Sequence, residues 1–159
     1  NFEKLSGFKF EVNFVKKLVD AFPKNIIGCK DSTYNLYENL KIKDFLIFPG
    51  DESKLLKGLQ IGCSGCISAI ANVTHKLARD VFDNYENNKP QTNNEKLIMV
   101  RKVFDNYNLI SSLHSYMSAQ NSKFENLLPP LRLLNSKESK ELLKKLETLK
   151  FSFKNNIAA

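Results

Sequence analysis

Lys30 is the residue of this sequence that is best placed for covalent chemistry. It closes the short apolar run Asn25–Lys30, which lies between Pro23 and Asp31 and is typical of a buried strand in a parallel sheet. Parallel α/β folds carry their reactive groups where such strands end. A lysine amine attacks a carbonyl only when it is neutral, and an apolar cavity favours that form. Lys30 is therefore a candidate nucleophile; in the alternative interpretation its stem simply covers the end of a strand.

Three acidic residues also follow expected strand ends. Asp31 comes directly after Lys30, and Asp51 and Glu52 follow the second apolar run of the chain. Because the carboxyl ends of parallel strands meet at one edge of a sheet, these carboxylates could bind substrate hydroxyls there. Equally, Asp51 has the residue type and the position of an N-cap for a helix that begins at Glu52.

The three cysteines support neither a metal site nor a disulfide framework. Cys63 and Cys66 have the C-x-x-C spacing of zinc and redox sites, but no second pair accompanies them, and His75 and His114 are isolated from each other. The alternative is a pair of small residues around a tight turn into a strand. The sequence also lacks the G-x-G-x-x-G, Walker and G-x-S-x-G motifs of nucleotide-binding proteins and serine hydrolases. No metal and no organic cofactor are expected.

Helices and strands that alternate along the first half of the chain must position these residues. Hydrophobic spacing and chain breakers predict a helix over Phe10–Phe22, strands over Asn25–Lys30, Phe45–Phe48 and Cys66–Ile70, a weaker helix over Tyr34–Leu40 and a helix over Glu52–Ile61. That rhythm favours right-handed β-α-β units and a parallel sheet, in a barrel or a doubly wound fold. From Val73 onward the spacing is helical, and it predicts helices over Val73–Tyr85, Asn94–Met117 and Lys137–Leu149.

Composition and charge indicate an ordinary globular protein of the cytosol. The chain has 159 residues, of which 42% are hydrophobic and 26% charged, and no apolar run approaches the length of a membrane span. Its start lacks the features of a signal peptide. The net charge of +7 could indicate a nucleic-acid partner, but the densest lysine cluster follows one face of an expected helix, as solvated charges do: Lys137, Lys140, Lys144 and Lys145. Neither a nucleic acid nor a membrane is an expected partner.

Four segments of the sequence resemble one family of enzymes in their order and spacing. Residues 25–32, NIIGCKDS, resemble the strand that carries the Schiff-base lysine of the dihydrodipicolinate synthase and N-acetylneuraminate lyase family. Residues 48–52, FPGDE, resemble the next strand end of that family, and residues 62–73, GCSGCISAIANV, resemble its eighth strand and the loop that follows. Leu128–Leu131, with Leu133 behind it, looks like the proline-rich segment before the family's last helix. The agreement extends over nearly the whole chain.

The resemblance implies an α/β fold, the C-terminal half of a (β/α)8 TIM barrel with strands six to eight, followed by a C-terminal helical extension. Residues 1–72 would hold the partial barrel, from just after strand five, and residues 73–159 the last barrel helix and the extension. The family's proton-relay tyrosine is then expected immediately upstream of Asn1, and its carboxylate-binding loop further upstream. A closed barrel needs about 250 residues, so the chain of 159 residues alone is expected to be inactive.

The resemblance also implies a reaction and the residues that carry it. Lys30 is expected to form an imine with the ketone of pyruvate or another 2-oxo acid, and the protonated imine then draws electrons from the carbon-carbon bond beside it. The backbones of Gly50 and Ile67 match family positions that line the pyruvate end of the pocket. Three further positions lie where the rest of the substrate is read: Glu52, Asp31 and Ser32. The family also suggests a homotetramer.

Details of the sequence favour a less specialised member of the family. Asp31 and Ser32 replace the Glu-Ala pair usual in dedicated dihydrodipicolinate synthases, Ala69 stands where sialic-acid lyases tend to have serine, and Leu128 replaces a frequent arginine. The best match is a lyase or aldolase that cleaves or forms a bond between pyruvate and an aldehyde. The alternatives are a 4-hydroxy-tetrahydrodipicolinate synthase proper, of lysine biosynthesis, a catalytically silent member that binds a 2-oxo acid, and a basic binding module.

Overall fold

The computed structural model describes residues 1–152, and the contacts within the chain divide it into two units. The first unit contains Asn1–Ser68 and Val81–Pro90, and the second contains Ala69–Asp80 with the described part of residues 91–159. The division falls inside helix α4 (Ala71–Glu86). Within residues 1–152, no helix has the length and apolar character that a membrane crossing requires.

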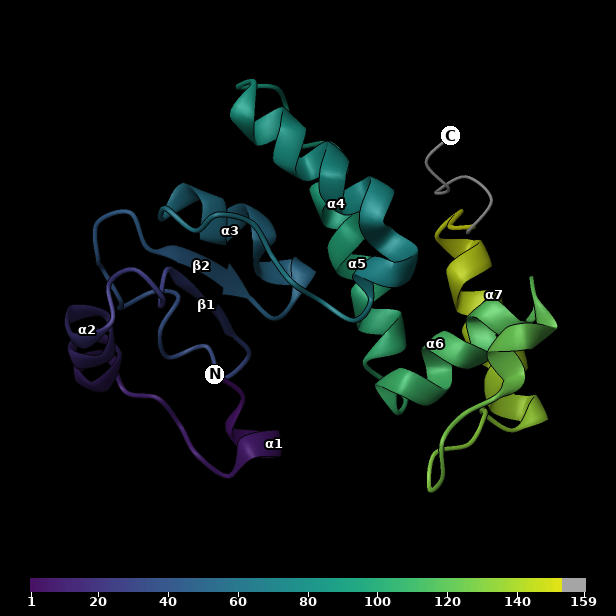
Figure 1. The fold of residues 1–159 in the computed structure, drawn as a ribbon. Helices are drawn as coiled ribbons and strands as arrows, with labels where there is room; N and C mark the ends of the chain where they lie inside the picture. The colour runs from purple at the N-terminus through teal and green to yellow at the C-terminus, as the bar shows by residue number, and fades with distance from the viewer. Residues whose placement is uncertain (153–159) are drawn as a thin grey trace. The chain divides into compact units, whose positions relative to one another are not determined.

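Two parallel strands form the centre of the first unit. In chain order, its elements before α4 are α1 (Glu3–Ser6), α2 (Val12–Ala21), β1 (Gly28–Asp31), β2 (Leu46–Pro49), the 3-10 helix η1 (Glu52–Lys54) and α3 (Leu55–Gln60) (Figure 1). Lys30 of β1 is the register partner of Phe48 in β2. The predicted helices over 10–22 and 52–61 and the predicted strand over 45–48 are thus confirmed, with shifts of one or two residues at their ends.

Strand β1 begins later than the sequence predicts. The amides of Asn25 and Ile26 both donate to the Phe22 carbonyl oxygen, at 3.0 Å each, so these residues close the end of α2. The first bond between the strands runs from the Leu46 amide to the Ile27 carbonyl oxygen, at 2.9 Å. Asn25 and Ile26 therefore belong to the turn after α2, and the pairing of the strands begins at Ile27.

The outer edge of β1 pairs with the first residue of the chain. The Asn1 amino group donates to the Lys30 carbonyl oxygen, and the Ser32 amide donates to the Asn1 carbonyl oxygen, both at 2.8 Å. This is the pattern of a parallel pair in which Asn1 stands opposite Asp31. Strand β1 therefore has hydrogen-bonded backbone on both of its sides.

The predicted strand Cys66–Ile70 is wrong, although the chain just before it follows β2. The Ser64 amide donates to the Ile47 carbonyl oxygen at 2.9 Å, and the Ile67 amide donates to the Pro49 carbonyl oxygen at 3.1 Å. The two acceptors are two residues apart and the two donors are three apart, so this segment contains one extra residue. Gly65 has a φ of +147°, which glycine adopts without steric cost. The extra residue interrupts the ladder that a third strand would need.

The predicted helix Tyr34–Leu40 is also wrong, because a side chain competes for its amides. Asp31 accepts hydrogen bonds from the backbone of Tyr34 at 3.0 Å, Leu36 at 2.8 Å and Tyr37 at 2.9 Å. Tyr34 has a left-handed φ of +66°, which a helix excludes. The segment instead winds around one carboxylate.

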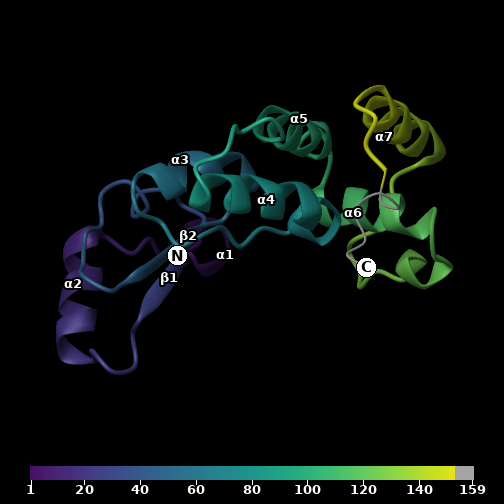
Figure 2. The ribbon, with the colours of Figure 1, turned by 90° about the horizontal axis from the view of Figure 1, so that it is seen from above.

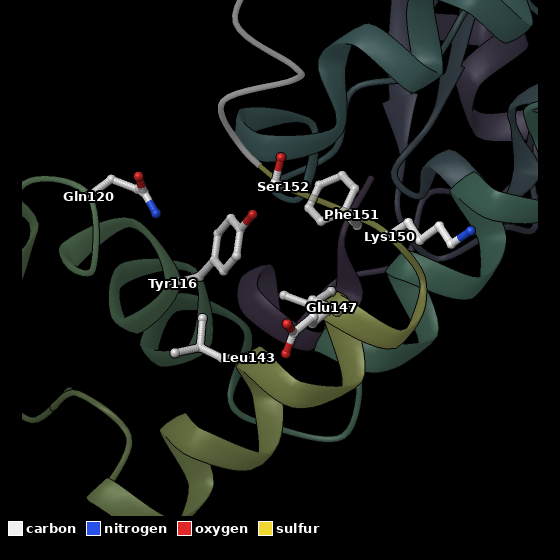
Figure 3. Close-up of a pocket in the computed structure, with 8 residues that line it drawn as sticks. Tyr116, Gln120, Leu143, Glu147, Lys150, Phe151 and Ser152 are labelled. Carbon is white, nitrogen blue, oxygen red and sulfur yellow. The ribbon is translucent and has the colours of Figure 1, made fainter.

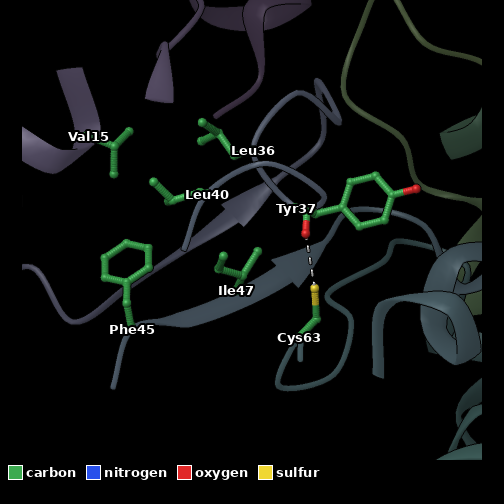
Figure 4. Close-up of a cluster of buried hydrophobic side chains, with 7 residues drawn as sticks. All are labelled: Val15, Leu36, Tyr37, Leu40, Phe45, Ile47 and Cys63. Carbon is green, nitrogen blue, oxygen red and sulfur yellow. Dashed lines mark hydrogen bonds between the residues drawn. The ribbon is translucent and has the colours of Figure 1, made fainter. Parts of the chain in front are cut away.

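Residues of the turn 34–40 form part of the hydrophobic core of the first unit. Leu36 and Leu40 are fully buried and pack with Val15 of α2 and Ile47 of β2 (Figure 4). The thiol of Cys63 belongs to the same cluster, and it donates to a backbone carbonyl oxygen of the turn. One face of the two strands is therefore covered by α2 and by the turn that follows β1.

Helices make up the second unit. After the part of α4 that belongs to it come α5 (Asn94–Phe104), α6 (Leu109–Ser118), the 3-10 helix η2 (Ser122–Glu125) and α7 (Ser136–Thr148), and α5, α6 and α7 pack on one another (Figure 1 and Figure 2). The rings of Phe104 and Tyr116 pack edge to face, with their centroids 5.8 Å apart. The predicted helices over 73–85 and 137–149 are confirmed, and α7 begins with a capping box at Asn135.

The single helix predicted over Asn94–Met117 is broken into α5 and α6. Asn108 has an extended backbone, with a φ of −60° and a ψ of 124°, and its side chain accepts a hydrogen bond from the Ser111 amide. Asn108 is therefore the N-cap of a new helix. The hydrophobic spacing continues across the break because both helices bury side chains in the second unit.

Replacement of Asp31 by alanine should destabilise the first unit. The amides of Leu36 and Tyr37 would lose their acceptor inside the fold, so we expect the free energy of unfolding to fall by roughly 2–4 kcal/mol. Urea unfolding of the intact protein measures this loss. Asp31→Asn keeps one acceptor oxygen, so its free energy of unfolding should lie between those of the wild type and Asp31→Ala. Asp20→Ala, a change at an exposed position of α2, is the control. An Asp31→Ala protein as stable as the Asp20→Ala control would contradict the role given to the carboxylate.

Candidate active site

Three of the predicted site residues meet at one edge of the sheet. Lys30 lies near the carboxyl end of β1, Gly50 directly follows β2, and Ile67 lies in the extended segment beyond it. The Gly50 amide donates to the Asp31 carbonyl oxygen at 2.8 Å, and the Ile67 amide donates to the Pro49 carbonyl oxygen at 3.1 Å. Backbone hydrogen bonds therefore join the ends of β1 and β2 and the segment of Ile67 into a continuous edge.

The side chain of Lys30 lies on the uncovered face of the two strands. Register partners in a parallel pair share a face, so Lys30 and Phe48 lie side by side there. Leu46 is 43% exposed on this face, and Lys30 itself is exposed. Asp31 and Ile47, on the opposite face, are buried. The candidate nucleophile thus stands on an apolar surface that the described residues leave open to solvent.

Ile67 joins this face because of the extra residue in its segment. Its amide reaches the Pro49 carbonyl oxygen, which places Ile67 opposite Gly50 and its side chain, 47% exposed, on the side of Lys30. A Cβ on Gly65 would lie 3.6 Å from the ring of Phe48. The segment therefore runs close against β2 beside the lysine.

Ser32 and Gly50 are in direct contact. A Cβ built on Gly50 would lie 2.1 Å from the Ser32 Oγ and 3.0 Å from the Ser32 Cα, which is far inside van der Waals distance. Glycine is therefore needed at position 50 for the two strand ends to approach each other. A contact of Ser32 with substrate stays a prediction.

The two acidic site residues are buried and bonded to the protein itself. Asp31 and Glu52 both have 0% exposure, and the Glu52 carboxylate accepts a hydrogen bond from the hydroxyl of Ser68. Contacts of Asp31 and Glu52 with substrate stay predictions. The N-cap role considered for Asp51 is confirmed, since its side chain accepts from the Ser53 amide at 2.8 Å at the start of η1.

The cysteines of the first unit are free thiols, of which Cys63 is buried and Cys29 and Cys66 are half-buried. Burial, followed by the nearby charge of Asp31, raises the pKa of Cys29 to about 11. Burial, followed by the charges of Glu52 and Asp51, raises the pKa of Cys66 to about 12. Thiols with such pKa values are weak nucleophiles at neutral pH. No group of His, Cys, Asp and Glu side chains within residues 1–152 is placed to hold a metal ion.

A pocket of about 430 Å³ lies in the second unit and contains none of the predicted site residues. Figure 3 shows the phenol of Tyr116 and the ring of Phe151 on its apolar side, with the polar side chains of Gln120, Glu147 and Lys150 around it. Tyr116 and Phe151 are themselves buried, and the centroids of their rings lie 6.0 Å apart. This is the packing of a helical core, and we assign no reaction to it.

The sequence alone does not reveal two residues of the site. The hydrophobic pattern places Phe48 in a strand, but only the register makes it the neighbour of Lys30; period-two alternation along both strands is the signal that indicates this pairing. Ser68 lies in a segment whose predicted strand does not form, and its partner Glu52 is 16 positions away. No local pattern links those two positions.

Comparison with known proteins supports the family resemblance over nearly the whole chain. The sequence model of the dihydrodipicolinate synthetase family matches residues 1–149. A 4-hydroxy-tetrahydrodipicolinate synthase from Hydrogenobaculum sp. is 35% identical over 89 residues, which are 54% of this chain and 30% of that protein. The synthase of the same name from Sodalis glossinidius is 43% identical over 58 residues, 33% of this chain and 20% of that protein.

Solved structures show the same fold. The 4-hydroxy-tetrahydrodipicolinate synthase of Methylacidiphilum fumariolicum SolV matches with a TM-score of 0.83 and 22% identity, covering 94% of this chain and 52% of that one. A prophage protein of the dihydrodipicolinic acid synthase family from E. coli K12, solved in complex with pyruvate, matches with a TM-score of 0.81 and 22% identity. The match covers 96% of this chain and 55% of that one. The chain thus spans about half the length of these structures, and the predicted partial barrel agrees with that coverage.

Gly50→Ala should push the strand ends apart. The added methyl group would overlap Ser32, so we expect a loss of roughly 1–3 kcal/mol in the free energy of unfolding, measured in urea. Removing the Ser32 side chain in Gly50→Ala/Ser32→Gly should recover part of the loss relative to Gly50→Ala. Gly58→Ala is the matched control, because its nearest contact would be an ordinary 3.4 Å. Equal stability of Gly50→Ala and Gly58→Ala would show that the close approach is not needed.

Proposed function

We propose, because the chain belongs to the dihydrodipicolinate synthetase family, that Lys30 is the Schiff-base nucleophile of a carbon-carbon lyase or aldolase acting on pyruvate or another 2-oxo acid. The observation that carries the proposal is the edge of the sheet beside Lys30, where backbone hydrogen bonds join Gly50 to Asp31 and Ile67 to Pro49. Parallel α/β folds place their chemistry at this edge. The uncovered apolar face beside Lys30 suits a carbonyl substrate that the rest of a barrel would enclose.

The reaction begins when the neutral amine of Lys30 adds to the ketone carbon of the 2-oxo acid. Loss of water breaks the carbon-oxygen bond and leaves a protonated imine. In the cleavage direction, the hydroxyl on the β carbon gives up its proton to the proton relay and the electrons of the bond between the α and β carbons move into the imine. The β carbon departs as an aldehyde and an enamine remains. Protonation of the enamine and hydrolysis then release pyruvate and the free amine. Synthesis follows the same steps in reverse order, and no metal or organic cofactor is required.

Gly50, Ile67 and Phe48 shape the pyruvate end of the proposed site. The Gly50 and Ile67 peptides lie beside the end of β1, so the small carboxylate substrate would be held next to Lys30 by backbone. The ring of Phe48, which neighbours Lys30 in the register, would form an apolar wall beside the amine. Substrate groups beyond the pyruvate carbons would extend toward Ser32 and the start of η1 at Glu52.

The pairing of Asn1 indicates where a proton relay would stand. Asn1 is opposite Asp31, so a residue that precedes Asn1 in the same strand would lie opposite Lys30 and on its face of the sheet. That is the position in which the predicted tyrosine would reach the amine. In the proposed whole protein, residues 1–72 belong to the barrel, with β1 and β2 as strands six and seven and the segment of Ile67 in the place of strand eight. Residues 73–159 belong to the last barrel helix and the extension, and the assembly is a cytosolic homotetramer.

A dedicated 4-hydroxy-tetrahydrodipicolinate synthase is the second candidate. The curated relatives from Hydrogenobaculum and Sodalis carry that name, which favours this activity over the less specialised lyase that the sequence suggested. Both candidates share the imine of Lys30 and differ in the aldehyde. Turnover of pyruvate with the aldehyde substrate of that synthase, compared with sugar-derived aldehydes, distinguishes them.

Treatment of the intact protein with pyruvate and borohydride should attach a reduced pyruvyl group to Lys30. The reductant converts the imine into a stable amine, and peptide mass spectrometry locates the added mass. Lys30→Ala should lose the adduct and turnover while it remains folded, because Lys30 is exposed and its removal leaves no cavity. Lys24→Ala, a change at an exposed lysine of the preceding turn, is the control. An adduct on a different lysine would refute the assignment.

Residues 1–159 expressed alone should self-associate and show no aldolase turnover. The face that carries Lys30 exposes Leu46 and Ile67, and such apolar sheet surfaces associate when nothing covers them. Size-exclusion chromatography measures the association, and a pyruvate-coupled assay measures the activity. Leu46→Lys, which charges that face, should reduce association. A monomeric chain that turns over substrate would contradict this prediction.

A further inference from the structure

The carboxylate of Glu52 links β2 to the segment that carries Ile67. Glu52 begins η1, two residues after Gly50, and its side chain is completely buried. The hydroxyl of Ser68 donates to Glu52 Oε2. Ser68 directly follows Ile67, whose amide bonds to the Pro49 carbonyl oxygen. One side-chain bond and one backbone bond therefore hold neighbouring residues of the segment to the end of β2.

Burial gives the side-chain bond its strength. A carboxylate removed from water needs donors of its own, and a hydroxyl that donates to a charged acceptor forms a stronger bond than a neutral pair. The backbone bond of Ile67 alone is weaker, and it follows the extra residue at Gly65, where the ladder is interrupted. Without the Glu52 anchor, the peptide of Ile67 would have more freedom to move.

A second observation places Glu52 behind the segment. The thiol of Cys66, which immediately precedes Ile67, has a raised pKa of about 12, first because of burial and next because of the charge of Glu52. Cys66 therefore lies within the electrostatic reach of the carboxylate, while the side chain of Ile67 lies on the face of Lys30. The segment is held from its buried side and presents its other side to the proposed site.

We propose that Glu52 acts through Ser68 as a positioning residue that fixes the Ile67 peptide beside Lys30, in place of the direct substrate contact expected from the family. This inference rests on the proposed function of Lys30. A wall of the site that is fixed before substrate arrives needs no reorganisation when the imine forms. Glu52 thus serves the shared pyruvate step, whichever aldehyde follows.

The test compares four variants of the intact protein: Glu52→Ala, Glu52→Gln, Ser68→Ala and the double variant Glu52→Ala/Ser68→Ala. A displaced Ile67 peptide should raise the KM for pyruvate and slow borohydride trapping of Lys30 by about 10-fold to 100-fold. The double variant should be no worse than the poorer single variant, because both remove one shared bond. Glu52→Gln keeps an acceptor oxygen and should restore most of the trapping rate. Glu11→Gln, which removes an exposed carboxylate, is the matched control.

Alkylation of Cys66 by iodoacetamide, followed by peptide mass spectrometry, gives a readout that does not depend on catalysis. Loosening of the segment should expose the thiol, so Glu52→Ala and Ser68→Ala should accelerate alkylation strongly. Glu52→Gln should stay near the wild-type rate, because burial, the largest cause of the raised pKa, is retained. Rapid alkylation of Glu52→Gln, equal to that of Glu52→Ala, would overturn the proposal.

Other outcomes separate this inference from the proposed function. If wild-type Lys30 is not trapped, the proposed function fails, while the Cys66 rates still report whether Glu52 and Ser68 hold the segment. If Lys30 is trapped normally in Ser68→Ala and Cys66 stays protected, the positioning role is overturned. A Glu52→Ala protein that traps pyruvate normally but changes its preference among aldehydes would establish direct substrate contact instead. Ser68→Ala loses a single hydroxyl and keeps the test valid if Glu52→Ala does not fold.

Discussion

The buried carboxylate of Asp31 is the interaction on which the candidate site depends. Its two oxygens accept five hydrogen bonds, from the side chain of Asn1 and from the amides of Thr33, Tyr34, Leu36 and Tyr37. A charge in this position is tolerable only because the backbone surrounds it with donors. The same bonds turn the chain so that Leu36 enters the core. The residue next to Lys30 therefore fixes the backbone from which the lysine projects.

The two faces of the strands differ in burial: one is covered by the rest of the first unit and the other is exposed. The face of Asp31 and Ile47 is covered by α2 and by the turn after β1, and it supplies the stability of the first unit. The face of Lys30 holds apolar side chains that remain exposed, together with a backbone edge joined by hydrogen bonds. Stability comes from one side, so the other side is available for substrate.

The sequence predicts those parts of the fold whose burial leaves a periodic pattern. Helices α2, α4 and α7 and strand β2 each bury one side, so their hydrophobic spacing located them, and the strand-end rule brought Lys30 and Gly50 together. The segment Tyr34–Leu40 has helical spacing, but Asp31 takes its amides, and propensity carries no information about that competition. The bond between Ser68 and Glu52 spans 16 positions and leaves no local signal. The substrate roles of the site residues stay predictions.

The extra residue in the segment after α3 also decides which side chain lies on the face of Lys30. With regular spacing, the amide of Cys66 would take the place of the Ile67 amide, and the thiol would project beside Lys30. Thiols add reversibly to aldehydes and 2-oxo acids, so a cysteine there would compete with the amine for the same carbonyl group. The inserted residue turns the sulfur to the buried side and presents a hydrocarbon side chain in its place. In the proposed site, the chemical selectivity of Lys30 would thus depend on the number of residues in this backbone segment as much as on the residues that touch the substrate.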